Sequence, residues 1–203
     1  MIGIIDYGAG NLRSVKKALD YLGVQSRILH NAGDFSGLEK VILPGVGAFQ
    51  AAVDKLHEYG MFQPIREWIA ADRPFLGICV GMQVLFERGE ESPNARGLAV
   101  FAGDVPRFQH HKVPQIGWNN VVIRQPSPLL KGIPDGAFFY FLHGFYCRPA
   151  DPEIIVAGTE YGVAYPAIVQ RGNTFAVQFH PEKSAENGLR LLKNWIDAEN
   201  TIF

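Results

Sequence analysis

The sequence has only two cysteines, no excess of charge of either sign and no long hydrophobic run. Cys79 and Cys147 lie far apart and form no C-x-x-C pair, so neither a disulfide framework nor a cysteine zinc site is expected. The sequence has nineteen Lys and Arg and twenty Asp and Glu, for a net charge of -1. This balance gives no strong electrostatic field that would attract nucleic acid or an anionic membrane. No segment approaches the ~18 apolar residues of a membrane span.

Other missing features limit the cell compartment and the classes of ligand that can be expected. The N-terminal MIGIIDYGAG has no basic leader and is interrupted at Asp6, which excludes an ordinary signal peptide; a reducing cytoplasm is expected. DYGAGN at 6–11 lacks the third glycine of a dinucleotide fingerprint, because Arg13 stands there. The adjacent His110 and His111 point in different directions and have no carboxylate cluster nearby. We therefore expect no metal and no cofactor, and small molecules or proteins as partners.

Enough apolar sequence is present for one full core. The chain has 203 residues, 47 % of them hydrophobic, which predicts a single domain over residues 1–203. In the first half, apolar runs that end in glycine or a turn alternate with segments of helical periodicity. The predicted strands are 2–6, 40–45 and 73–79. The predicted helices carry Leu12, Val15, Leu19 and Leu22 up to Gly23, and Val53 and Leu56 up to Gly60.

The second half has a different pattern. Between residues 98 and 180, β-rich runs follow one another closely, with a hairpin predicted around 171–173. A final helix is predicted with Leu189, Leu192 and Ile196 on one face and Trp195 at its edge. The predicted fold is α/β, with a central, mostly parallel sheet that is flanked by helices and extended by antiparallel strands.

Cys79 is the first candidate for chemistry. It lies in GICVGMQ (77–83), where a predicted strand meets a predicted helix over GMQVLFE (81–87). This is the pattern of a nucleophile elbow with cysteine in place of serine, and a helix N-terminus would stabilise a thiolate. The alternative is that Cys79 is a small core residue, as we expect for Cys147.

A base and an oxyanion site can also be named. His180 and Glu182 follow the last strand in QFHPEKS, where the carboxylate can receive a ring N–H of the histidine. Alone, these two could equally be a surface pair. The loop LPGVGAF (43–49) is poor in side chains, so backbone amides around Val46 and Gly47, together with that of Val80, could bind an oxyanion; the alternative is an ordinary turn.

Taken together, Cys79, HPE (180–182) and PGVG (44–47) resemble the class I glutamine amidotransferases. DYGAGNLRSV at the N-terminus, LPGVGAF, IGWN (116–119), FYFLH (139–143) and FHPEKS (179–184) resemble one branch, the glutaminase subunits of imidazole glycerol phosphate synthase. The similarity extends from residue 2 to the final helix, and the combination of motifs is far more specific than any one of them.

The resemblance implies a role for each matching residue. The triad comprises Cys79 as nucleophile, His180 as general acid and base, and Glu182 as its orienting partner. Val46, Gly47 and Val80 would surround the oxyanion. Glutamine would be held by Gly47, Gln83, His143, Gly144 and Phe145. Two residues depart from the family pattern: Val80 replaces a leucine, and Gly144-Phe145 replaces a hydroxyl residue followed by tyrosine, so only backbone contacts remain there.

The resemblance also implies a reaction and a partner. Glutamine is hydrolysed to glutamate and ammonia, which a (β/α)8-barrel cyclase uses to convert N'-phosphoribulosylformimino-AICAR phosphate into imidazole glycerol phosphate and AICAR in histidine biosynthesis. The length leaves no room for that acceptor site, so a heterodimer is expected, with Asn11, Trp118 and Lys183 towards the partner. The alternatives are a glutaminase of another synthase, of the pyridoxal phosphate or anthranilate type, and a binding module with an inert triad.

Overall fold

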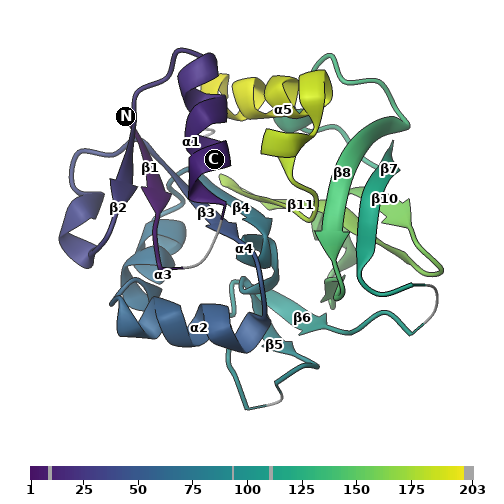
Figure 1. Cartoon of the computed structure of the whole chain (residues 1–203), viewed down its shortest axis with the longest axis horizontal. Helices are drawn as coiled ribbons and strands as arrows, with labels where there is room; N and C mark the ends of the chain where they lie inside the picture. Colours follow the sequence, from purple (N-terminus) through teal and green to yellow (C-terminus); the bar gives the residue numbers. More distant parts are fainter. Residues whose placement is uncertain (9–10, 93, 110–111, 199–203) are drawn as a thin grey trace.

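A nine-stranded mixed sheet forms the centre of the molecule (Figure 1). The computed structural model describes residues 1–8, 11–92, 94–109 and 112–198, so His110 and His111 lie outside the described residues. Along the sheet the strands follow the order β2-β1-β3-β4-β12-β11-β10-β7-β8. The predicted fold class, a parallel sheet with an antiparallel extension, is confirmed.

The parallel half contains the strands that the apolar runs predict. Its strands are β2 (Ser26–Leu29), β1 (Ile2–Ile5), β3 (Lys40–Gly45), β4 (Phe75–Cys79) and β12 (Thr174–Val177). Helix α1 (Leu12–Tyr21) covers one face, and α2 (Phe49–Glu58) and α3 (Phe62–Ala70) cover the other (Figure 1). β1, β4 and β12 are buried throughout, as strands covered on both faces must be.

The antiparallel half follows from the closely spaced strands. Its members are β11 (Ala164–Arg171), β10 (Ile155–Glu160), β7 (Gln115–Ile123) and β8 (Ala137–His143). β11 and β12 form the predicted hairpin, with Arg171 opposite Thr174. The 3-10 turns η1 (Ala32–Phe35), η2 (Pro128–Leu130), η3 (Pro152–Ile154) and η4 (Pro181–Lys183) connect the elements.

The predicted helix over GMQVLFE is wrong beyond its first turn. Helix α4 spans only Val80–Gln83, and the chain then enters β5 (Phe86–Gly89). Val84, Leu85 and Phe86 are all buried, and three successive positions cannot share one face of a helix. β5 joins β6 (Phe101–Val105) and β9 (Arg148–Pro149) in a small second sheet that the sequence did not predict; β2 and α3 were not predicted either.

The final helix, α5 (Ala185–Asp197), presents a different face from the one predicted. Its buried residues are Gly188, Leu191, Leu192 and Trp195, whereas Leu189 and Ile196 are only partly buried. These positions follow the i, i+3, i+4, i+7 spacing of one helical face. Trp195, predicted at the edge, is therefore at the centre of the contact, with no exposed surface.

In the described part of the chain, no helix is long and apolar enough to cross a membrane.

The position of Trp195 predicts a difference between two neighbouring substitutions. Trp195→Ala should lower the free energy of unfolding by about 3–5 kcal/mol, because it removes a fully buried indole. Ile196→Ala should cost clearly less, because Ile196 is only partly buried. Urea unfolding followed by circular dichroism measures both; equal losses would contradict the burial of this face.

Candidate functional site

Cys79 occupies a strained turn at the carboxyl end of β4. Its backbone has φ 55° and ψ −109°, a region that non-glycine residues rarely adopt and that is enriched at functional sites. The two flanking glycines permit the turn. A Cβ on Gly81 would lie 1.9 Å from the carbonyl oxygen of Leu43, and one on Gly77 would lie 2.6 Å from that of Gly81.

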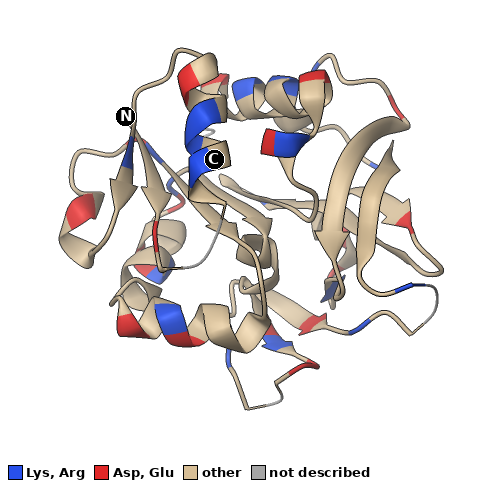
Figure 2. Ribbon diagram, in the orientation of Figure 1, with Lys and Arg blue, Asp and Glu red and all other residues tan. Residues whose placement is uncertain are grey.

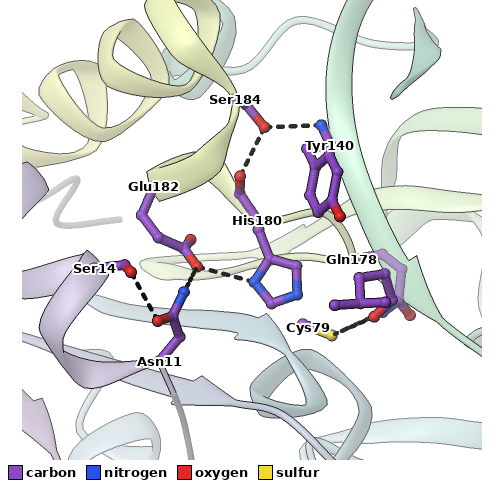
Figure 3. Close-up of polar contacts among 9 residues, drawn as sticks. Asn11, Ser14, Cys79, Tyr140, Gln178, His180, Glu182 and Ser184 are labelled. Carbon is purple, nitrogen blue, oxygen red and sulfur yellow. Dashed lines mark hydrogen bonds and ion pairs between the residues drawn. The ribbon is translucent and has the colours of Figure 1, made fainter. Parts of the chain in front are cut away.

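His180 and Glu182 form a buried pair beside this turn (Figure 3). The His180 Nδ1 lies 2.9 Å from Glu182 Oε1, and each side chain is 1 % exposed. A carboxylate oxygen only accepts, so Nδ1 carries the hydrogen. His180 Nε2 is buried and has no hydrogen-bond partner among the residues described. The alternative of a surface pair is therefore wrong.

The charge on His180 is favoured by its neighbours. Burial would lower the pKa of His180, but its interactions with Cys79 and Glu182 outweigh burial and raise the pKa to about 10. Imidazolium is thus the form of His180 that is favoured at neutral pH. Cys147, in contrast, is fully buried, and burial raises the pKa of its thiol well above the ordinary value.

Asn11 contacts Glu182, which sequence reasoning did not predict. Its Nδ2 donates to Glu182 Oε1 at 3.1 Å, and Ser14 Oγ donates to Asn11 Oδ1 at 2.7 Å (Figure 3). The start of α1 therefore helps to orient Glu182. A signal was available, because Asn11 precedes the first helix and so lies at the same edge of the sheet as Cys79.

Backbone contacts tie the histidine segment to β8. The His180 amide donates to the carbonyl of Tyr140 at 2.9 Å. Ser184 Oγ donates to the His180 carbonyl at 2.7 Å and accepts from the Tyr140 amide at 2.9 Å (Figure 3). The position of the imidazole is thus coupled to the strand that carries Tyr140.

A cavity of about 260 Å³ opens next to Cys79. Every residue that the family pattern places around the oxyanion or the glutamine lines it: Val46, Gly47, Val80, Gln83, His143, Gly144 and Phe145, with Pro114 and Leu142 in addition. Gly47 has φ +100°, which a side chain would strain. Gly45 lies opposite Cys79 in the β3–β4 pairing. This pairing holds the loop at 43–49 next to Cys79.

His143 is held as a neutral imidazole in the wall of this cavity. Its Nδ1 lies 2.7 Å from the Phe145 carbonyl, which only accepts, so Nδ1 carries the hydrogen. Its Nε2 lies 3.2 Å from the hydroxyl oxygen of Tyr165, whose one hydrogen is donated to Gln115 Oε1. Burial is the main cause that lowers the pKa of His143 to about 4. This side chain can orient a substrate without adding charge.

Gln83, which lines the cavity, contacts a second buried glutamine, Gln178. Gln83 Nε2 donates to the Phe145 carbonyl at 3.0 Å and to Gln178 Oε1 at 3.3 Å. Gln178, which the sequence interpretation did not single out, is fully buried, and its Nε2 lies 3.8 Å from Cys79 Sγ. Its position directly before FHPE was the only available signal.

The two other residues predicted to face a partner are both exposed. Trp118 is 53 % exposed on β7 and packs edge to face on Tyr140 at 6.2 Å between ring centroids. Lys183 is exposed, and its Nζ lies 5.9 Å from the centroid of the same Tyr140 ring. Tyr140 therefore lies between them and also carries the backbone contacts to His180.

Comparison with known proteins places this geometry in a family. The family model described as glutamine amidotransferase class-I matches residues 3–198. A relative from Desulfitobacterium hafniense (strain DSM 10664 / DCB-2), imidazole glycerol phosphate synthase subunit HisH, is 48 % identical, with 100 % of this chain and 98 % of the relative covered. The protein of the same name from Caldanaerobacter subterraneus subsp. tengcongensis is 47 % identical, with 96 % and 97 % covered.

Similarity to solved structures agrees at the level of the fold. A crystal structure of a glutamine amidotransferase superposes with a TM-score of 0.77 at 22 % identity, covering 97 % of both chains. The family model and the full-length relatives confirm the resemblance that the motifs indicated. This chain belongs to the class I glutamine amidotransferase family and, within it, to the group of imidazole glycerol phosphate synthase subunits called HisH.

Proposed function

We propose that this chain is the glutaminase subunit of an imidazole glycerol phosphate synthase, which hydrolyses glutamine and passes ammonia to a cyclase subunit. One observation carries the catalytic part: a buried imidazole, oriented by a carboxylate at 2.9 Å, beside a strained cysteine that opens into a cavity. The full-length similarity to HisH supports the choice of synthase. A glutaminase of another synthase would share the triad but not this similarity.

The proposed reaction begins with attack of the Cys79 thiolate on the side-chain amide carbon of glutamine. Backbone amides of Gly47 and Val80 stabilise the oxyanion, and His180 Nε2 protonates the departing ammonia. The resulting γ-glutamyl thioester is hydrolysed by water that His180 activates, which releases glutamate. Glu182 keeps the imidazole in the correct tautomer throughout.

The candidate partner surface lies on β7 and β8, and the carbonyl of Tyr140 on β8 accepts from the His180 amide. β8 is the edge of the nine-stranded sheet, and neither β7 nor β8 contains a charged residue, in contrast to α1, α2 and α5 (Figure 2). The outer face of the pair exposes Ile116, Trp118, Val122 and Phe138 to 60 %, 53 %, 45 % and 56 %. An exposed apolar face of this kind is typical of a protein interface, and we assign it to the cyclase barrel.

The first prediction from the proposed function concerns the nucleophile, Cys79. Cys79→Ala should abolish synthesis from glutamine and leave synthesis from ammonium salts by the complex, because only ammonia supply is lost. Cys147→Ala is the matched control and should retain both activities, since that buried thiol has no part in the site. A glutamine-analogue electrophile should label Cys79 alone. Loss of both activities in Cys79→Ala would contradict a pure ammonia-supply role.

The second prediction concerns pH. Because the pKa of His180 is raised to about 10, its proton is present below that pH, and kcat for glutamine hydrolysis by the complex should fall as pH rises through it. Glu182→Gln removes a charge that favours the imidazolium, so the alkaline limb should move down by at least about 1 pH unit. Glu186→Gln, at an exposed position of α5, is the control. An unmoved limb in Glu182→Gln would refute this role of the carboxylate.

The third prediction concerns the partner surface. Trp118→Ala should weaken binding of the cyclase subunit by at least about 30-fold, the effect of a buried aromatic hot spot, and Lys183→Ala should weaken it less. Tyr21→Ala removes an aromatic side chain that is 78 % exposed on α1 and should leave affinity unchanged. Isothermal titration calorimetry measures all three. Wild-type affinity in both Trp118→Ala and Lys183→Ala would show that the barrel binds elsewhere.

A further inference from the structure

We infer that the carboxamide of Gln178 donates a hydrogen bond to the Cys79 thiolate and positions its sulfur for attack. The inference rests on the proposed glutaminase function and adds a residue to its machinery. Gln178 is fully buried, and its Nε2 is 3.8 Å from Cys79 Sγ. In Figure 3, Gln178 and Cys79 both lie near the imidazole of His180.

The direction of the Gln178 amide follows from its neighbours. The carbonyl of Phe145 can only accept, so the group of Gln83 that faces it at 3.0 Å is the NH2 group. The same nitrogen lies 3.3 Å from Gln178, so the atom of Gln178 at that contact must be its oxygen. The NH2 group of Gln178 is then left to face the sulfur. This relay from Phe145 through Gln83 fixes the donor towards Cys79.

The need for this donor arises when the thiol ionises. In the thiol form of Cys79, the S–H group donates to the carbonyl of Leu142 at 3.7 Å. When the S–H bond breaks, the proton passes to His180 Nε2 and the electron pair remains on sulfur. The Leu142 carbonyl then faces a negative charge and becomes unfavourable. The Gln178 N–H and the His180 imidazolium are the groups that can compensate a thiolate that is only 2 % exposed.

The sheet explains why this contact is reproducible. β4 and β12 pair in parallel, with Ile78 opposite Val177. Cys79 is the last residue of β4 and Gln178 is the first residue after β12, so the register places them side by side at the carboxyl edge. The backbone N–H of Gln178 donates to the carbonyl oxygen of Ala167 at 2.9 Å. This bond holds Gln178 in place beyond the end of β12.

The test measures the thiolate directly. Gln178→Met keeps the length of the side chain and removes the donor. Its rate of Cys79 alkylation by iodoacetamide at neutral pH should fall at least about 10-fold, and the ultraviolet titration of the thiolate should move to higher pH. Gln170→Met, on β11, removes a carboxamide whose bonds go to Ser127 and Gly172 and should match wild type in both readouts.

A second variant separates this role from mere support of Gln83. Gln178→Glu keeps an oxygen for Gln83 but replaces the donor to sulfur by a second oxygen, so the thiolate should be suppressed at least as strongly as in Gln178→Met. A wild-type alkylation rate and titration in either variant, with folding verified by circular dichroism, would overturn the inference. Glutamine turnover is assayed in parallel: a reactive wild-type Cys79 without turnover would instead refute the proposed function.

Discussion

The parallel pairing of β4 with β12 is the constraint on which the site depends. It joins residues about a hundred positions apart and sets their register, with Phe75 opposite Thr174 and Ile78 opposite Val177. Both strands end at the same edge, where Cys79 leaves one and the histidine segment leaves the other. In an open α/β sheet this edge is where ligands bind. A shift of register by one residue would turn alternate side chains to the opposite face and separate Cys79 from His180.

Close packing at the end of β4 then determines the backbone conformation of Cys79. The turn at Gly81 approaches the carbonyl of Leu43 so closely that no side chain fits, and Cys79 adopts a positive φ as a result. The cost of this conformation is of order 1–3 kcal/mol, and the buried strands β3, β4 and β12 stabilise it. The strain holds the sulfur at the cavity.

Much of this arrangement is predictable from the sequence, because the patterns that indicate it each lie within a short stretch of the chain. Glycines around Cys79, the HPE motif and unbroken apolar strands each carry a pattern within a few residues. The short helix α4 and the buried face of α5 were missed because tertiary packing decides them: Val84 to Phe86 are buried by the small sheet, and Trp195 by the central one. The contacts of Asn11 and Gln178 join distant segments, and no single stretch of sequence contains them.

Strand β8 connects the exposed outer face of the sheet with the segment that carries His180. Successive residues of a strand point to opposite sides, so Phe139, Phe141 and His143 are buried while Phe138 and Tyr140 face outwards. Tyr140 lies between Trp118 and Lys183 on the outside, and its backbone holds the segment of His180 on the inside. A protein that binds the outer face would contact Tyr140. The backbone of this same residue, on β8, holds the segment that carries His180. Because the strand also ends in the wall of the cavity, a displacement of β8 would change both His180 and the substrate pocket together.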